Sequence, residues 1–395
     1  MIKKVLWFFE HFEREMPIIN LCRERLEAEG IDVEIQPSLL NFPELSIYGQ
    51  SYHAIIVPSK NRLLARILQN IDIPIICLNY EQMLSGINNA LKAPDALVKQ
   101  ASYLLAWSDD FGHYLKHNGI DPDAIIYSQR PQNAIARQYI DSTNFHLPVF
   151  VQEAKKRFKN IIYLPLTCLQ AFKTDAELWR LAKATGVDNS LLTTRKYAVR
   201  RQIVSLYQEI EKATESFFIL RPHPGVTIED HKSLLREIGI KELSNLLITD
   251  EGNAYDWLNI SDIVVSNYSS VLLDAKAVEK DTYLFKPNIL PQWMHYDWFD
   301  DFNVIHSFDD WDLSQAKKNT TRPKAYDYPA NSEAVTEILK HALQEKAAVL
   351  SKKRLFHLAH SPRFWADILR LIKVQAGFGD LKVKKDYESF KKYTC

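Results

Sequence analysis

The sequence predicts an α/β protein made of two doubly wound, Rossmann-like domains. Short apolar runs rich in Val, Ile, Leu and aromatic residues alternate with segments of helical spacing along most of the 395 residues. Continuous apolar runs are typical of parallel strands covered on both faces, and their alternation with helices indicates a parallel sheet. The pattern occurs as two series, which begin near the amino terminus and at residue 160.

The first series predicts an amino-terminal domain over residues 1–140. Its first apolar run is interpreted as a buried strand rather than a secretory signal, because Glu10, Glu13 and Glu15 follow at once. The polar stretch 129–144 is expected to separate this series from the next. Strands are predicted at 4–9, 33–36, 54–58, 73–78, 103–107 and 124–127, and helices at 17–29, 62–69, 93–100 and 109–117.

The second series predicts another domain over residues 155–350, with a closing helix at 332–350. Strands are predicted at 161–166, 217–220, 246–249, 263–266 and 283–285, and helices at 175–185, 196–215, 229–238, 254–260 and 270–279. The acidic stretch 300–312 is expected to be a surface loop. Residues 351–395 are predicted to hold a further helix at 362–376 and a basic tail, which is either a solvated end or a contact to anionic lipid or to a downstream domain.

The composition excludes several classes of protein. With 46% apolar and 25% charged residues the chain is an ordinary globular protein, and 49 basic against 49 acidic residues leave no net field to attract nucleic acid. The 11 glycines include no Gly-rich dinucleotide or P-loop motif. The four cysteines form no C-x-x-C pair, which fits a reducing, cytoplasmic location. No apolar run is long enough to span a membrane, but peripheral association at the inner face of the cytoplasmic membrane stays open.

The most informative motif is the run Phe217-Phe-Ile-Leu-Arg-Pro-His-Pro-Gly225. An apolar strand stops here at a cation and an imidazole, and open sheets bind ligands at the carboxyl ends of their strands. Pro222 and Pro224 restrict the backbone on either side of His223. Arg221 could offer a forked charge to a phosphate. The alternative is a proline turn that carries a surface histidine.

A second motif lies at 261–274, where an apolar strand ends in small polar residues that open a helix. Ser269 or Ser270 is expected to be the helix N-cap. A helix start with free backbone N–H groups and adjacent hydroxyls can hold a phosphate without glycine. Serine at an N-cap is also routine, so the alternative is a purely structural role. Together the two motifs suit the two sides of a nucleotide phosphate.

These motifs resemble the nucleotide-binding half of GT-B transferases that use cytidine-activated donors. The resemblance rests on Arg221-Pro-His-Pro-Gly225, Tyr255-Asp-Trp-Leu258, Ser261-Asp262, Asn267-Tyr-Ser-Ser270, Asp274 and Lys286-Pro287. Such families include CDP-glycerol glycerophosphotransferases and the bacterial Kdo and sialic acid transferases, which share a His-Pro motif and a later Ser-Ser motif. The resemblance implies a GT-B fold, with two Rossmann-like domains facing a central cleft.

The resemblance also assigns the donor site. It implies that His223, Ser269 and Ser270 contact the donor phosphate, with His223 counted among the catalytic residues and Arg221 as a neighbour. Asn267 and Tyr268 belong to the same motif and are predicted donor contacts. Glu251 or Asn253, which follow the strand predicted at 246–249, are expected to meet the ribose or the base.

Two carboxylates are candidates for the chemistry. Glu81 follows the strand predicted at 73–78 and is the candidate base for an acceptor hydroxyl, the alternative being an exposed loop residue. The Gln170…Asp175 spacing is similar to that of retaining Kdo transferases, which implies Asp175 as a covalent nucleophile. The alternative for Asp175 is a helix N-cap.

The sequence therefore predicts a glycosyltransferase of bacterial surface polysaccharide assembly, which moves Kdo or a related sugar from a CMP-activated donor to an oligosaccharide or glycolipid acceptor. The alternatives are a CDP-glycerol or CDP-ribitol phosphotransferase, disfavoured by the missing Trp-His-Gly-x-Pro-x-Lys motif, and a non-catalytic nucleotide-sugar-binding scaffold. No cofactor or metal is expected. The run Asp310-Trp-Asp312 matches the D-x-D motif of metal-dependent transferases, but it lies in the acidic loop and does not end an early strand. The chain could be one module of a larger polypeptide.

Overall fold

The computed structural model describes residues 3–10, 12–37, 51–58, 73–80, 82, 98–99, 101–141, 148–223, 225–308, 328–343 and 348–349. Within these residues the chain forms two α/β units, each built on a parallel sheet of six strands. The first unit takes in residues 1–82, 92–134 and 324–395, and the second takes in 83–91 and 135–323. The predicted pair of doubly wound domains is confirmed.

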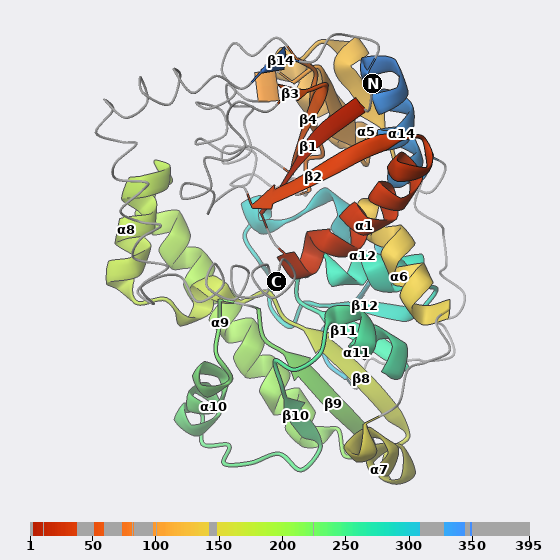
Figure 1. Ribbon diagram of the computed structural model, residues 1–395. Helices are drawn as coiled ribbons and strands as arrows, with labels where there is room; N and C mark the ends of the chain where they lie inside the picture. Colours follow the sequence, from red (N-terminus) through yellow and green to blue (C-terminus); the bar gives the residue numbers. More distant parts are fainter. Residues whose placement is uncertain are drawn as a thin grey trace, which may run out of the picture. The chain divides into compact units, whose positions relative to one another are not determined.

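The sheet of the first unit has the strand order β2-β1-β4-β5-β6-β7, of which Figure 1 labels β2, β1 and β4. Its central strand β1 is bonded to a neighbour on both edges, and Val5, Leu6 and Trp7 are fully buried. This explains why the run at 4–9 is apolar without alternation. The strands are β1 (Lys3–Phe9), β2 (Ile31–Pro37), β4 (Ala54–Val57), β5 (Ile75–Cys77), β6 (Tyr103–Ala106) and β7 (Ile125–Tyr127); β3 (Ser51–Tyr52) pairs antiparallel with β14 (Ala348–Val349).

The helices of the first unit are α1 (Phe12–Ala28), α5 (Asp109–His117), the amino-terminal turn of α6 (Pro131–Asp141) and α14 (Asn331–Ala342), with a 3-10 turn η2 at Pro122–Ala124. The helix α5 has the predicted bounds, because Ser108 accepts a hydrogen bond from the Phe111 N–H and thereby caps it. The helix α1 begins five residues earlier than predicted, with Pro17 inside it.

The sheet of the second unit has the order β10-β9-β8-β11-β12-β13. The chain first builds outward from β8 to β10 and then returns to the other side of β8, which is the strand order of dinucleotide-binding folds. Its strands are β8 (Asn160–Pro165), β9 (Ser216–Arg221), β10 (Leu246–Ile248), β11 (Ile263–Ser266), β12 (Asp281–Phe285) and β13 (Asn303–Ile305).

Most helices of the second unit share one apolar core with these strands, whereas Leu178 and Ala182 of the helix at 175–185 form a separate small cluster with Leu192. The long helix α9 (Asn189–Lys212), labelled in Figure 1, is amphipathic. Its residues Val199, Ile203 and Leu206 are buried in that core. The helices are α7 (Val149–Arg157), α8 (Asp175–Thr185), α9 (Asn189–Lys212), α10 (Ile228–Glu237), α11 (Ala254–Ile260) and α12 (Val271–Ala277), with 3-10 turns η3 at Leu169–Phe172, η4 at Gln292–Met294 and η5 at Asp297–Asp301.

The structure differs from the sequence prediction at four places. The polar stretch 129–144 is mostly the helix α6, in which Ile135 and Ala136 are buried. The acidic loop predicted at 300–312 begins as η5 and β13, the sixth strand of its sheet. The helix α7 was not predicted. The helix α14, predicted within the second domain, is part of the first unit and packs against α1.

Several predictions lie outside the described residues. These are Glu81, the helices at 62–69 and 362–376, all of 93–100 except 98–99, Asp310-Trp-Asp312 and the basic tail. No described helix is long and apolar enough to cross a membrane.

Candidate functional site

The predicted donor residues follow strands of the second sheet. Because all six strands are parallel, their carboxyl ends form one edge of the sheet. Along this edge the loops after β10, β9, β8 and β11 lie in that order, and the chain reverses direction between β8 and β11. Open α/β sheets bind ligands at such a switch point. The residues after β9 and β11 therefore lie on either side of the loop that follows β8.

The loop after β9 orients His223. The Nδ1 atom of His223 accepts a hydrogen bond from the Gly225 N–H at 3.1 Å. In a neutral imidazole whose Nδ1 is an acceptor, the proton is on Nε2. The ring thus offers an N–H donor from Nε2. A Cβ atom at Gly225 would lie 2.8 Å from Leu169 Cδ1, so a larger residue here would displace the Leu169 side chain.

Arg221 ends β9 and is half-buried. Its Nη2 donates a hydrogen bond to the Gly252 carbonyl at 3.0 Å, which joins the loops after β9 and β10. This bond engages one of the five N–H donors of the guanidinium. A forked contact of Arg221 with a phosphate would therefore use the remaining ones.

Three buried polar side chains, those of Cys168, His231 and Tyr207, lie in a row beneath the loop after β9 that carries His223. The His223 N–H donates to Cys168 Sγ, which is 3.8 Å from His231 Nε2, and His231 Nδ1 is 2.6 Å from the Tyr207 hydroxyl. Burial raises the pKa of Cys168 to about 12, although the His223 N–H opposes the rise, and burial lowers the pKa of His231 to about 4 despite the nearby Asp230. All three side chains are therefore neutral near pH 7. The sequence pattern did not predict this group of buried polar side chains.

Asn267, predicted as a donor contact, braces the loop after β11. Its Oδ1 accepts from the N–H groups of Thr167 at 3.3 Å and Tyr268 at 3.0 Å, and its Nδ2 donates to the Thr167 carbonyl at 3.3 Å. The side chain is 2% exposed. Asn267 therefore fastens the loops after β8 and β11 to each other and has no remaining atom at the surface for a donor.

The paired serines have different environments. Ser269 is buried, donates its N–H to Ser266 Oγ at 3.2 Å and accepts from the Val271 N–H through its own Oγ at 3.3 Å. Ser270 occupies the N-cap position of α12, is half-buried and makes no capping bond with its side chain. Of the two serines, Ser270 thus has the hydroxyl that capping leaves for a ligand.

The expected row of free N–H groups at the start of α12 is mostly occupied. The N–H of Val271 is bonded to Ser269 Oγ, and those of Leu272 and Leu273 are bonded to the carbonyls of Ser269 and Ser270 at 3.1 and 3.0 Å. The cause is a tight turn that closes these bonds within the loop. A phosphate at this edge would consequently depend on side chains more than on the helix start.

Tyr268 belongs to an aromatic and cationic cluster that the sequence did not reveal. Its ring stacks on Tyr296 at 6.2 Å, and the Arg195 guanidinium lies over it at 5.5 Å. Arg195 also donates to the Tyr296 hydroxyl at 3.2 Å. Burial raises the pKa of Tyr268, so its phenol stays neutral. Tyr268 is 4% exposed and is better suited to support Ser269 than to contact a donor directly.

The two residues expected near the ribose or base have different positions. Asn253 is the N-cap of α11: its Oδ1 accepts from the N–H groups of Tyr255 and Asp256, and its Nδ2 donates to the Tyr139 hydroxyl at 2.7 Å. Asn253 is therefore occupied by capping. The Glu251 side chain is exposed at the sheet edge, and its backbone is fixed by bonds to Thr249 and Trp257.

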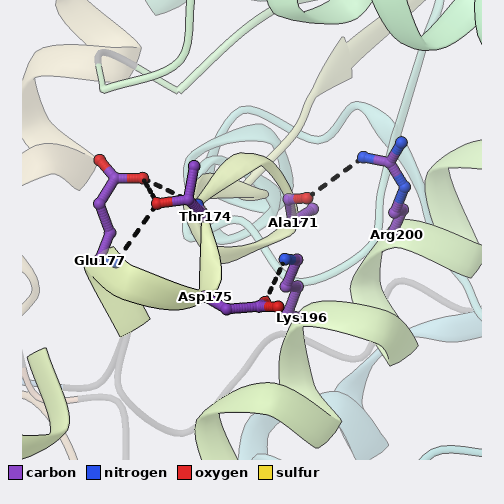
Figure 2. A network of polar contacts seen from close by, with 6 residues as sticks. All are labelled: Ala171, Thr174, Asp175, Glu177, Lys196 and Arg200. Atoms are coloured by element: carbon purple, nitrogen blue, oxygen red, sulfur yellow. Dashed lines mark hydrogen bonds and ion pairs between the residues drawn. The ribbon is translucent and has the colours of Figure 1, made fainter. Parts of the chain in front are cut away.

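Asp175 is the first residue of α8 and not its N-cap. Figure 2 shows Thr174 as the cap, which forms a reciprocal capping box with Glu177. The Asp175 carboxylate accepts from Lys196 Nζ at 2.8 Å and is 75% exposed. The same view contains Arg200, which donates to the Ala171 carbonyl at 3.4 Å. This network joins α8, η3 and α9, and gives Asp175 a structural partner.

In the first unit, the residues on either side of Glu81 are firmly held. Asn79 has a φ of 50°, and its Nδ2 donates to the Leu105 carbonyl at 3.2 Å. Gln82 donates to the same carbonyl at 2.9 Å and accepts from the Trp107 N–H. The loop after β5 is thus attached to β6 at the carboxyl edge. The described residues contain no group of three or more His, Cys, Asp or Glu side chains that could hold a metal ion.

No protein-family model matches this sequence, and neither does any curated protein. The fold, in contrast, matches solved structures. A UDP-GlcNAc 2-epimerase from Methanocaldococcus jannaschii, solved with UDP-GlcNAc and UDP, has a TM-score of 0.53 and 13% identity over 86% of this chain and 100% of that one.

Two further structures are similar. S. aureus MnaA with UDP has a TM-score of 0.52 and 10% identity, over 95% of this chain and 97% of that one. A variant of the wall teichoic acid polymerase TagF has a TM-score of 0.51 and 13% identity, over 87% and 89%. At these identities the comparison establishes a shared fold. The chain has the GT-B-like pair of parallel-sheet units found in these proteins.

Proposed function

We propose that the protein is a transferase of bacterial surface-polymer assembly that uses a nucleotide-activated donor. One observation carries the proposal: Arg221 and His223 on one side and Ser270 on the other flank the switch point of the second sheet. Their loops are fixed to the intervening β8 loop by Cys168 and Asn267. A fixed Nε2 donor, a guanidinium and a hydroxyl suit a phosphate that gains charge as it leaves.

The donor that we propose is a CMP-activated sugar, with Kdo first among the candidates. In the transfer the bond between the anomeric carbon and the phosphate oxygen breaks, and CMP leaves with the electron pair. Hydrogen bonds from His223, Arg221 and Ser270 would stabilise the charge on CMP. The acceptor hydroxyl forms the new bond and gives its proton to a base, for which Glu81 stays our candidate.

If the transfer retains configuration, Asp175 is the proposed nucleophile and would form a covalent intermediate that the acceptor then displaces. The ion pair with Lys196 favours a structural role instead, because it engages the carboxylate at the start of α8. An inverting transfer needs no such residue.

A second candidate is a CDP-glycerol or CDP-ribitol phosphotransferase. The similarity of fold to a polymerase of wall teichoic acid supports it. Here the acceptor would attack phosphorus and release CMP, so the product is a phosphodiester. A non-catalytic subunit that binds a nucleotide sugar is the third candidate.

Product analysis separates the three. The full chain would be incubated with CMP-Kdo or CDP-glycerol and a panel of saccharide and glycolipid acceptors, and CMP release and product mass would be measured. CMP with a glycoside supports the sugar transferase, and CMP with a phosphodiester supports the second candidate. Binding of CMP with no consumption of any cytidine donor would contradict both enzymes and favour the subunit.

A further inference from the structure

A second concave site lies on the same edge of the second sheet, beyond β12. It is a hollow of about 230 Å³ formed by the segment that follows β12 together with Phe299 and His306. Its polar lining consists of Lys286, His295, His306, Asn288 and Gln292. None of the residues that line it is acidic. The hollow therefore offers the ammonium group of Lys286 and two side-chain amides around apolar walls.

Lys286 carries the ammonium group of the hollow. It directly follows β12 and is half-buried, and its Nζ lies 4.2 Å from the centre of the Phe299 ring. Burial lowers the pKa of Lys286, although Asp300 opposes the change. Among the described residues, no ion pair to a carboxylate is found for Lys286. A desolvated ammonium without a salt bridge is costly unless an anion joins it.

Two histidines line the hollow beside this lysine. His306 Nδ1 lies 2.6 Å from the Lys286 carbonyl, which makes Nδ1 the donor and fixes the ring beside the lysine backbone. His295 Nε2 lies 3.4 Å from the exposed Asp300. The Phe299 ring forms a wall shared with the Arg195–Tyr268–Tyr296 cluster. The hollow thus lies next to the aromatic cluster that supports the loop carrying Ser269 and Ser270.

We infer that this hollow binds an anionic group, a carboxylate or a phosphate monoester, carried by the unit that the enzyme transfers or receives, with Lys286 as its main contact. The hollow lies close to the proposed donor site, because β12 is next to β11, whose loop holds the paired serines. The identity of the bound molecule therefore rests on the proposed function. A sugar acid would present a carboxylate to Lys286 and its hydroxyls to Asn288 and Gln292. A phosphorylated alcohol would present its phosphate to the same lysine.

The hollow can be tested directly with small probes. In the full chain, carbon-bound ring protons of the histidines would be followed by NMR, assigned with His295→Gln and His306→Gln, while Kdo, glycerol 3-phosphate or neutral glycerol is added. We expect an anionic probe to shift the His295 and His306 signals and leave His113 in the other unit unchanged. Kdo alone would identify a carboxylate as the ligand, and glycerol 3-phosphate alone a phosphate. No shift with either, or an equal shift with glycerol, overturns the inference.

A matched pair of lysine variants tests the main contact. Lys276 is also half-buried, and its Nζ lies over the Phe302 ring at 5.1 Å, but it does not line the hollow. Lys286→Met should weaken binding of the anionic probe by about tenfold or more, the value of a charge-assisted hydrogen bond. Lys276→Met should leave binding unchanged. Equal effects of the two substitutions would contradict the role of Lys286.

A third titration separates this inference from the proposed function. CMP carries no transferred unit, so its affinity should be the same in the wild-type chain and in Lys286→Met. If CMP and CDP do not bind the wild-type chain, the proposed function fails, whereas the probe titrations still decide the hollow. If CMP binds and loses affinity in Lys286→Met, the hollow is part of the nucleotide site and the inference is wrong.

Discussion

At the scale of single residues, His223 and His231 lie close to each other but have different surroundings. His231 is buried between Cys168 and Tyr207, whereas His223 is partly exposed and accepts a hydrogen bond from the Gly225 N–H through Nδ1. A buried neutral imidazole supports structure, and an exposed one with a fixed ring can act on a ligand. The two residues therefore lead to different predictions.

Replacing His223 by Ala should lower donor turnover by about a hundredfold or more, because one preorganised donor to the leaving phosphate is lost. The free energy of unfolding should change little, since the side chain is partly exposed. Release of CMP from the donor and urea unfolding would measure the two effects. His113→Ala, an exposed histidine of the first unit, is the control. Full turnover in His223→Ala would exclude His223 from the phosphate site.

His231 should make stability depend on pH. Its pKa is about 4 in the folded protein because of burial, against 6.5 ordinarily. Below pH 6.5 the unfolded chain therefore binds a proton that the folded chain refuses until about pH 4. The free energy of unfolding should fall by about 3 kcal/mol across this window from this residue alone. Urea midpoints at pH 7.5 and 4.5 would measure it, and the fall should be smaller in His231→Gln. An equal fall in the variant would contradict the assignment.

At the scale of elements, Asn267 connects the ends of β8 and β11. Asn267→Ala removes four hydrogen bonds, one of them from the Ser266 hydroxyl, and takes the Asn267 partner away from the backbone N–H and carbonyl of Thr167, so it should cost about 2 kcal/mol of stability. Nucleotide affinity should also fall. Asn245→Ala is a matched control, because Asn245 donates to the Ile210 and Ala213 carbonyls at the opposite edge of the same sheet.

The comparison of these two asparagine variants decides what Asn267 does. Both should unfold at lower urea concentration, but only Asn267→Ala should bind CMP more weakly in a calorimetric titration. If both lose affinity equally, the effect comes from general destabilisation of the unit.

The start of α8 offers a separate prediction. Thr174→Ala should cost about 1 kcal/mol through loss of the capping box and leave turnover unchanged. Asp175→Asn loses only an exposed ion pair, which is worth at most about 1 kcal/mol. If Asp175 is the nucleophile, turnover in Asp175→Asn should fall to background. Unchanged turnover in Asp175→Asn would remove that role.

The sequence predicted the elements better than the roles of residues. Strands such as 263–266 are found with the predicted bounds, because a continuous apolar run has one stable place inside a parallel sheet. The strand β13 was missed because it is three residues long and follows two aspartates. Its apolar content is too small to give a pattern.

Within the candidate site, the motifs predicted which loops lie at the carboxyl ends of the strands. They did not predict the role of each side chain. Asn253 and Asn267 have the polarity of ligand contacts, yet their amides satisfy backbone groups that folding would otherwise leave unpaired. Arg195, Cys168 and His231 were missed because no sequence pattern marks them. Arg195 lies on α9 and His231 on α10, and the packing of these helices brings them to the loops after β8 and β11.

At the scale of the whole molecule, a net charge of zero means that the proposed anionic donor would be attracted by local charges and not by the chain as a whole. Local cations at the second sheet edge, Arg221 and Lys286 among them, fulfil that requirement. Selectivity must then come from contacts to the base and the transferred unit. This leads to a prediction about nucleotides.

Among CMP, CDP, UDP, GDP and ADP, we expect CMP or CDP to raise the melting temperature selectively. A ligand at 100 times its Kd stabilises the folded state by about 2.7 kcal/mol, which corresponds to several degrees. Differential scanning calorimetry of the full chain would measure the shift. A selective response to UDP or GDP would replace the proposed donor and retain the fold, and no response to any of the five would contradict the transferase proposal.

The place of β8 has one more consequence. The strand is hydrogen-bonded along both of its edges, and the loop that follows it is fastened on one side by Cys168 and on the other by Asn267. Binding usually loses conformational entropy, because loops and side chains become immobile in the complex. Here much of that ordering has already happened during folding. This edge of the second unit therefore acts as a rigid template, and a ligand that fits it should bind with little rearrangement of the backbone.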